Sequence, residues 1–295
     1  MLKRNSLGDM IFEVIVLIIM AVVSFVTLYP IWYTVVLSFN DGNDAMLGGI
    51  YWWPRIFTLD NYVAVFRNPG IMRSFVVTIT RTLIGTVTSV FFTAMVAYAL
   101  SKKDLVFRKI YFGMGIVTMF FGGGLIPYFL LLKSLNLLDN FWVYIIPALF
   151  GFYNCLIFIA FFNELPAEVE ESAKIDGAND LYIFLKIVLP MSKPVLATIA
   201  LFAGVYHWND YFSGVIYIQR RSDLEPIQTF LYRVVSESAS NSMMRQLPAG
   251  VTTSQVTQQS VRLATMIVTT LPIVCVYPFL QKYFVKGIMI GAVKG

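Results

Sequence analysis

Charged side chains are scarce in this 295-residue chain, where Asp, Glu, Lys and Arg together make up 13% of the residues. Soluble domains usually carry about 25%. Hydrophobic residues account for 58% of the chain, and its mean hydropathy is +0.71. Several segments of roughly 18 or more residues carry no charge, and a helix of that length can cross the ~30 Å hydrocarbon core of a bilayer. The composition therefore excludes an ordinary soluble protein and predicts an all-α, polytopic membrane protein.

Groups that commonly carry catalysis or bind metals are also scarce. The chain has two cysteines and one histidine. Cys155 and Cys275 fall within apolar segments and lack the spacing of metal ligands, so we interpret them as small buried hydrophobic residues. His207 and Asp210 form an i, i+3 pair on one helix face. The histidine is either a hydrogen-bonded packing residue or a catalytic group, and no nucleophile arrangement or metal-ligand spacing stands out elsewhere.

The sequence also lacks the G-x-x-x-x-G-K-S/T loop that binds ATP phosphates. The chain is therefore not expected to be an enzyme, and any ATP hydrolysis must take place on a separate polypeptide. Its formal net charge is +5, but the basic residues are scattered at the ends of apolar segments, where Lys and Arg side chains reach the membrane surface. This distribution favours contact with membrane lipid and gives no support for nucleic-acid binding.

Six apolar segments predict six transmembrane helices within one permease domain, residues 10–285. The expected spans are 10–37, 71–100, 110–132, 141–163, 194–218 and 263–281. Residues 14–39 carry no charge, which is longer than the hydrophobic part of a secretory signal, so we expect the first span to be retained. Six crossings place residues 1–9 and 286–295 on one side of the membrane, which we expect to be the cytoplasmic side of a bacterial inner membrane.

The distribution of basic residues favours this orientation. Of the 22 Lys and Arg residues, twelve fall on the expected cytoplasmic side and nine on the outer side, with Arg81 inside the second span. Cytoplasmic segments of membrane proteins carry an excess of Lys and Arg. Because the margin is modest, the orientation depends equally on the loop at 164–193, which is expected to need a cytoplasmic partner.

Two features of the spans leave alternatives open, and two loop segments have a composition of their own. Arg81 is costly at the centre of a bilayer, so its side chain either extends to the membrane surface or lines a polar path. The glycine run 122–124 and Pro127 interrupt the third span, which indicates either a broken helix beside a cavity or close packing of helices through small residues. The Tyr-Trp-Trp-Pro run at 51–54 is typical of an interfacial anchor. Residues 219–262 form a polar outer loop whose role the sequence does not assign.

The loop at 164–193 is the longest charged segment between two apolar spans. Pro166 suits the first position of a helix, because its missing N–H would have no partner there. Glu168, Glu170 and Glu171 lie near that end, where the positive end of the helix dipole favours acidic side chains. Gly177 can adopt the left-handed conformation that commonly ends a helix. The segment therefore predicts a short, rigid, acidic helix outside the bilayer.

The spacing Glu171-Ser172-Ala173, Gly177, Ile187 and Leu189-Pro190 resembles the EAA loop of ABC-importer permeases, EAA-x3-G-x9-I-x-LP. Ser172 stands where the family usually has alanine, and it remains small. The resemblance continues outside the loop in four further motifs. These motifs are Ala97-Tyr-Ala-Leu-Ser101, Asn136-Leu-Leu-Asp139, Trp208-Asn-Asp210 and the Gly287–Gly295 ending, all similar to MalG-like carbohydrate permeases.

Two other motifs resemble the LplC/YtcP branch, whose members are assigned to complex oligosaccharides. They are Gly122-Gly-Gly-Leu-Ile-Pro127 and Asn163-Glu-Leu-Pro-Ala-Glu168. The resemblance covers roughly residues 58–295. It implies the type I ABC-importer permease fold and a function in ATP-driven oligosaccharide import. It leaves open whether the sugar is neutral or contains uronates.

The resemblance also implies partners and site residues. The expected partners are a second homologous permease, two copies of a cytoplasmic ATPase that bind ATP and Mg, and an extracytoplasmic sugar-binding protein. The expected ATPase-coupling residues are Glu168, Glu171, Ser172, Ala173, Asp176, Gly177 and Ala178. Small residues there would allow close approach of the ATPase, and Glu171 would pair with one of its basic residues.

The sugar pathway is expected where aromatic faces lie beside polar groups. The candidates are Tyr153, Asn154, Trp208, Asn209, Asp210 and Tyr211. Each of them can equally serve packing between helices. An alternative to the importer is an ion-coupled secondary transporter that uses Arg81, His207 and Asp210 as its intramembrane charges, although the chain shows no convincing inverted repeat.

Overall fold

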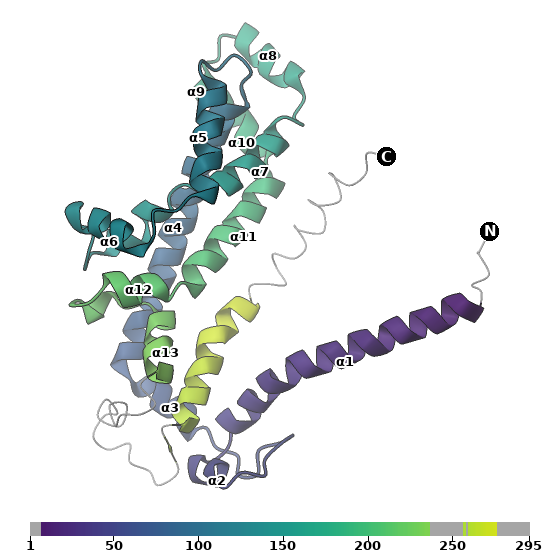
Figure 1. Cartoon of the computed structure of the whole chain (residues 1–295), viewed down its shortest axis with the longest axis vertical. Helices are drawn as coiled ribbons and strands as arrows, with labels where there is room; N and C mark the ends of the chain where they lie inside the picture. Colours follow the sequence, from purple (N-terminus) through teal and green to yellow (C-terminus); the bar gives the residue numbers. More distant parts are fainter. Residues whose placement is uncertain (1–6, 237–255, 258, 276–295) are drawn as a thin grey trace. The chain divides into compact units, whose positions relative to one another are not determined.

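The computed structural model describes residues 7–236, 256–257 and 259–275 (Figure 1). Within these residues the chain is helical, apart from one isolated β-bridge between Asn40 and Phe57. The chain divides into two compact units, one of residues 1–69 and 234–270, the other of residues 70–233 and 271–295. Each unit is described separately.

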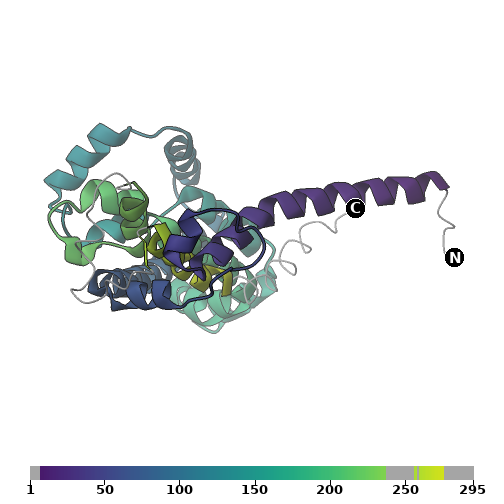
Figure 2. The same cartoon turned by 90° about the horizontal axis from the view of Figure 1, so that it is seen from below.

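The first unit begins with α1 (Leu7–Ser38), which forms one long rod (Figure 2). Its central residues are apolar and uncharged, as a spanning helix requires. None of its most apolar 18-residue stretch is buried within the described chain. Its C-terminal end, however, is anchored, because Val36 and Leu37 pack with Ile50 and Leu263. Residues 10–37, predicted as the first span, lie within this one continuous helix.

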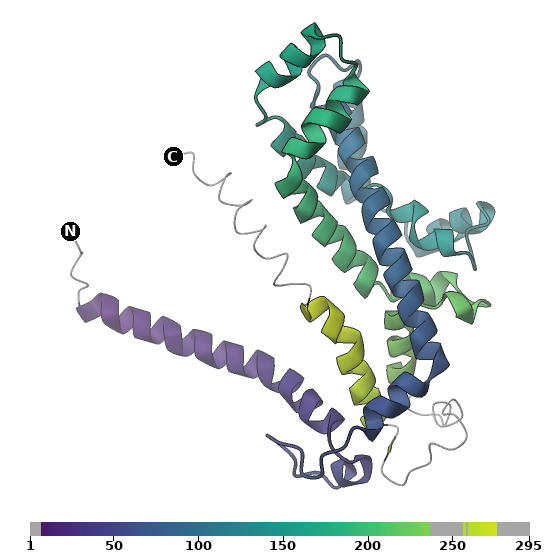
Figure 3. The ribbon, with the colours of Figure 1, turned by 180° about the vertical axis from the view of Figure 1, so that it is seen from behind.

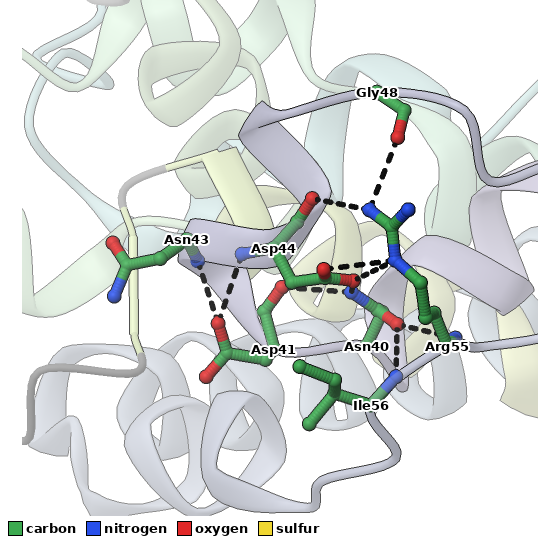
Figure 4. A network of polar contacts seen from close by, with 7 residues as sticks. All are labelled: Asn40, Asp41, Asn43, Asp44, Gly48, Arg55 and Ile56. Carbon is green, nitrogen blue, oxygen red and sulfur yellow. Dashed lines mark hydrogen bonds and ion pairs between the residues drawn. The ribbon is translucent and has the colours of Figure 1, made fainter.

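The loop after α1 folds back on this helix. It contains α2 (Gly42–Met46) and leads to α3 (Asp60–Arg67). The Trp32 indole N–H donates to the carbonyl of Trp52, and the Trp52 ring lies edge-on to Tyr29. A polar network fixes the turn beneath these rings (Figure 4): the Asn40 amide oxygen accepts from the backbone N–H groups of Arg55 and Ile56.

The second unit is built around α4 (Pro69–Ser101), which is long and apolar enough to cross a membrane. The remaining elements of this unit follow in chain order. They are α5 (Arg108–Phe120), α6 (Leu125–Ser134), η1 (Phe141–Tyr144), η2 (Ile146–Ala148), α7 (Phe152–Phe162), α8 (Ala167–Ile175), α9 (Asp180–Ile183), η3 (Phe184–Val188), α10 (Leu189–Met191), α11 (Lys193–Asn209), α12 (Phe212–Tyr217), η4 (Ser222–Leu224) and α13 (Ile227–Ser236).

Three predicted spans are not straight helices. The third is broken after Phe120, and α5 and α6 meet at 116°. The fourth is broken between η2 and α7, with a bend of 46°. The fifth ends at Asn209, because Asp210 adopts an extended conformation and α12 begins only at Phe212. Among the described residues, two helices can span a membrane, or up to five if each bent pair counts as one span.

The glycine run in the third span marks a break in the helix and does not pack against another helix of the described chain. A Cβ atom added to Gly122, Gly123 or Gly124 would meet nothing within 4 Å in the described chain, and Gly124 has a φ of 81°. The small residue that does allow close packing is Gly115, whose position a Cβ could occupy only by displacing the Phe152 ring. Of the two interpretations of the glycine run, the structure therefore favours the broken helix.

The sixth predicted span lies only partly within the described residues. A helix occupies residues 259–275, and the rest of that span and the tail at 286–295 lie outside the described part. Residues 1–6 of the predicted N-terminal segment also lie outside it. Within the outer loop predicted at 219–262, the described residues include η4, the whole of α13 and the first residues of the helix at 259–275.

An apolar core packs α8 against the C-terminal end of α4. The core contains Tyr98 of α4, Phe158 of α7, Ala173 of α8 and Phe184 of η3. Figure 3 shows α8 beyond the C-terminal end of α4. The π-helical turn η3 comes just before Pro190, whose ring lacks an N–H and conflicts with regular α-helical bonding.

Candidate functional site

The acidic helix predicted from the loop sequence is present as α8. Pro166 stands just before the helix as its N-cap, with a ψ of 125°, and not at the first helical position as expected. Glu168 and Glu170 occupy the first turn, where the helix dipole favours them. The predicted start of the helix was therefore one residue too early, whereas the prediction of a short helix here is confirmed.

The other end of α8 closes with a Schellman motif, in which a residue of positive φ reverses the chain. Gly177 has a φ of 79°. Its N–H donates to Lys174 O at 3.0 Å, and the N–H of Ala178 donates to Ala173 O, also at 3.0 Å. The left-handed conformation predicted for Gly177 is confirmed.

The predicted coupling residues divide between two faces of α8 and its cap. Ala173 is buried in the apolar core, and Ala178 packs against that core. The small size of Ala173 therefore serves the packing of α8 on its own chain, which differs from the expected close approach by a partner. The remaining predicted residues are exposed: Glu168, Glu171, Ser172, Asp176 and Gly177.

Two features of this site were missed by the sequence analysis. Ile175 is 86% exposed at the end of α8, beside the acidic side chains. An isoleucine directly before Asp176-Gly177 in a polar helix was the available signal. Lys102, the first residue after α4, forms an ion pair with Glu170, and its ammonium lies 4.0 Å from the centroid of the Tyr98 ring. Lys102 and Glu170 are separated by 68 positions in the sequence, and no local pattern indicated that they meet.

A second polar cluster lies at the far end of α11. The Arg81 side chain is fully buried and donates to the Asp210 carboxylate at 2.6 Å and to the Asp210 carbonyl at 3.2 Å. Its guanidinium carbon lies 4.3 Å from the centroid of the Tyr144 ring. Extension to the membrane surface, one of the two alternatives for Arg81, is therefore wrong, because the charge is neutralised inside the protein.

His207 lies one turn before this ion pair and is 1% exposed. Its ring fills the space beside Gly85 of α4, where no Cβ would fit, and lies edge-on to Tyr206. This contact supports the interpretation of His207 as a packing residue between α4 and α11.

A cavity of about 280 Å³ lies on the other side of His207. Its polar lining comes from Ser89 of α4, Asn154 of α7, and Tyr206 and His207 of α11. The break between η2 and α7 supplies the backbone of Gly151 and its neighbours. Irregular backbone at membrane depth is tolerated where it lines such a cavity. The Nδ1 atom of His207 has no hydrogen-bond partner within the described chain.

The predicted pathway residues do not form one site. Asn154 lines the polar cavity, whereas Trp208 lines a separate apolar pocket of about 360 Å³ between α4 and α11. Asp210 holds Arg81, and Asn209 donates to Val205 O within its own helix. Tyr211 stacks on Tyr232 with their ring centroids 4.9 Å apart. Tyr153 is exposed and lines neither pocket.

Comparisons with known proteins agree with this architecture. Protein LplC of Bacillus subtilis (strain 168) is 38% identical over 99% of this chain and 98% of its own length. The polygalacturonan/rhamnogalacturonan transport system permease protein YtcP of the same organism is 38% identical over 99% of this chain and 100% of its own length.

A solved structure extends the similarity to the fold. One chain of a bacterial ABC transporter involved in the import of the acidic polysaccharide alginate superposes with a TM-score of 0.89 and 31% identity, over 96% of this chain and 99% of the other. The family profile described as "Binding-protein-dependent transport system inner membrane component" matches residues 2–290. The chain therefore belongs to this family of multi-pass inner-membrane permeases, the non-catalytic subunits of ATP-driven importers.

Proposed function

We propose that this chain is the permease subunit of an oligosaccharide importer and that its exposed α8 surface is where a cytoplasmic ATPase drives it. The observation that carries the proposal is the division of α8 into two faces. Ala173 anchors the helix in the core, while Glu171 and Ile175 are exposed outside it. Acidic side chains beside the exposed apolar side chain of Ile175 suit a partner groove with basic edges.

The proposed topology has six crossings with both ends of the chain in the cytoplasm. The broken segments 108–134 and 141–162 each count as one crossing, α11 and α12 form the fifth, and the helix at 259–275 belongs to the sixth. The excess of Lys and Arg on the α8 side supports this orientation. The α5–α6 elbow would then lie within the membrane beside the partner permease, because its glycines have no neighbour in the described chain.

The proposed assembly contains this chain, a second homologous permease, two ATPase subunits and an extracytoplasmic sugar-binding protein. ATP and Mg would bind the ATPase subunits only. Glu168, Glu171, Ser172, Asp176 and Gly177 would contact the ATPase, and Ile175 would enter its groove. Closure of the ATPase dimer would displace α8 and rock the two permeases between their outward-facing and inward-facing states.

The proposed substrate is an oligosaccharide, on the strength of relatives named for polygalacturonan, rhamnogalacturonan and alginate. The cavity beside His207 supports a sugar path, because the Asn154 amide and the Ser89 and Tyr206 hydroxyls can bond sugar hydroxyls. An ion-coupled mechanism finds less support. Arg81 and Asp210 neutralise each other in a buried ion pair, which leaves neither charge available to a coupling ion. The family is also ATP-driven.

A transport assay tests this proposal directly. The complex, co-purified through an affinity tag on this chain, is reconstituted into liposomes with its binding protein. Oligogalacturonides and alginate oligosaccharides serve as uronate probes and malto-oligosaccharides as a neutral probe. We expect accumulation of one class, which requires both ATP and the binding protein. Uptake that persists without the ATPase, or that requires an ion gradient, would contradict the proposal.

The orientation has its own test. In a variant with Cys155 and Cys275 replaced by alanine, Glu171→Cys is probed in intact cells with a thiol reagent that does not cross the inner membrane. We expect no labelling until the membrane is permeabilised. Labelling of the intact cells would place α8 outside and leave the ATPase without its contact.

A further inference from the structure

The contacts between α8 and α4 determine whether a displacement of α8 also moves α4. A nine-residue helix is marginal by itself, so α8 depends on contacts with the rest of the chain. In the apolar core, α8 contributes Ala173, which buries little surface, and Leu165 and Ala178 pack against the core on either side of the helix. Contacts of this kind resist compression, but they resist sliding and lifting only weakly.

A directional contact is present beside them. Lys102 follows Ser101, the last residue of α4, and its ammonium pairs with the carboxylate of Glu170. The same ammonium lies over the Tyr98 ring, one turn back on α4. Tyr98 itself belongs to the apolar core and is 6% exposed. Lys102 therefore joins a first-turn residue of α8 to a buried side chain of α4.

The position of Glu170 separates this contact from the partner surface. Glu170 precedes Ala173 by three residues, so the two side chains share the face of α8 that lies against the chain. Glu171, one residue further, is on the exposed face. The two adjacent glutamates thus point to different neighbours.

The local environment makes the pair stronger than an ordinary surface pair. The side chains of Lys102 and Glu170 are only 24% and 23% exposed. Partial burial lowers the effective dielectric constant, which strengthens both the ion pair and the cation–π contact. Neither side chain belongs to the apolar core around Phe158 and Phe184, so a neutral substitution is expected to leave that core folded.

We propose that Lys102 is a positioning residue for transport: through Glu170 and Tyr98 it clamps α8 to the C-terminal end of α4, so that displacement of α8 moves α4. This inference rests on the proposed function, because α8 must first receive the displacement. It assigns the two glutamates separate roles, with Glu171 facing the ATPase and Glu170 facing the permease.

The test measures sugar accumulated per ATP hydrolysed by the complete complex in liposomes, with the oligosaccharide probe that the wild-type complex accumulates. Lys102→Met and Glu170→Gln should each lower this ratio by about three- to tenfold while the ATPase still co-purifies. Lys102→Arg should stay within about twofold, because a guanidinium keeps the charge and stacks on a tyrosine ring. The double variant Lys102→Met/Glu170→Gln should be no worse than either single variant.

A matched control comes from the neighbouring residue. Lys103 is exposed and forms no ion pair within the described chain, so Lys103→Met should leave the ratio unchanged. Tyr98→Leu supplies an independent variant, and we expect it to lower the ratio while Tyr98→Phe, which keeps the ring, does not.

The outcomes distinguish this inference from the proposed function. A wild-type complex that shows no ATP-dependent uptake defeats the proposed function. A wild-type complex that transports, together with an unchanged ratio in Lys102→Met and Glu170→Gln, overturns the clamp alone. Loss of ATPase binding in these variants would also overturn it, because Glu170 would then belong to the partner surface. Additive losses in the double variant would show that the two residues do not act as a pair.

Discussion

Arg81 and Asp210 are 129 residues apart in the sequence, and their side chains meet at 2.6 Å between α4 and the end of α11. The Arg81 side chain is fully buried, and that of Asp210 is 11% exposed. Removing one partner of a buried pair leaves an uncompensated charge, which typically costs about 3–5 kcal/mol.

We therefore predict that Arg81→Met and Asp210→Asn each lower the thermal stability of the detergent-solubilised protein sharply. The double variant Arg81→Met/Asp210→Leu should lose less than either single variant, because no buried charge remains. Size-exclusion chromatography after a temperature series measures the transition. The exposed pair Arg221–Asp223 is the control, and Arg221→Ala should change stability by less than about 1 kcal/mol. Equal losses at both pairs would contradict the prediction.

A bulky residue at the end of α8 should uncouple transport without unfolding the chain. Gly177 has a positive φ, and a Cβ there would meet nothing within 4 Å in the described chain. In Gly177→Trp the left-handed conformation costs about 1–2 kcal/mol, and the indole would enlarge the surface proposed to contact the ATPase. We expect normal membrane insertion and loss of ATP-dependent uptake.

Gly49 provides the matched control for this experiment. It has a φ of 76° and equally open surroundings, so Gly49→Trp carries the same backbone cost away from α8. Its uptake should stay near that of the wild type. Normal uptake by Gly177→Trp would remove the case for a partner at this surface.

Acid should loosen the loop after α1 through Asp44. Hydrogen bonds from Arg55 and Asn40 hold the pKa of the Asp44 carboxyl below its ordinary value of 3.8 (Figure 4). Because the pKa is lowered in the folded state, the stabilisation is present above pH ~4 and is lost as the pH falls through the folded-state value.

The measurement is the Trp fluorescence of the loop between pH 7 and pH 2.5, since Trp52 and Trp53 follow its packing on α1. We expect a change only below pH ~4 in the wild type. Asp44→Asn should show the loosened signal at every pH. A wild-type transition near neutral pH would assign the change to another group.

The polar cavity gives a prediction about substrate passage. Asn154→Leu should lower uptake several-fold while ATP hydrolysis stimulated by the binding protein persists, because the lost hydrogen bonds concern the sugar and not α8. Asn209→Leu is the control, since Asn209 lines neither pocket and bonds within its own helix. Equal effects of the two variants would contradict a sugar path through the cavity.

Sequence reasoning predicted local structure well and contacts between distant segments poorly. The spans at 10–37 and 71–100 match α1 and α4 to within a few residues, because long uncharged apolar runs have few alternatives. The cap at Gly177 was predictable because it too depends on local sequence: glycine adopts the positive φ that ends a helix. The sequence analysis missed the break between η2 and α7. Pro147 and Gly151 lie within the predicted span 141–163, but the composition around them is uniformly apolar.

The polar contacts inside the site could not be predicted at all. Arg81 had two possible environments, and only the fold shows that Asp210 reaches it. Ala173 was expected to face a partner, since a small residue suits any close contact, and the direction of its side chain depends on how α8 rests on α4 and η3. The rotation of α8 about its own axis likewise decides whether Glu170 or Glu171 faces the rest of the chain.

The π-helical turn η3 contains one more residue per hydrogen-bonded ring than an α-helix. Each residue of a regular helix advances its face by about 100°, so adding or removing one residue elsewhere in a helix rotates everything beyond it. A wider turn takes up the extra residue locally. Deleting a single residue within 184–188 would therefore let η3 rewind as regular α-helix while the segments on either side keep nearly the same faces. This turn is thus a point in the loop at which the chain length can change by one residue with little change in what the neighbouring helices present.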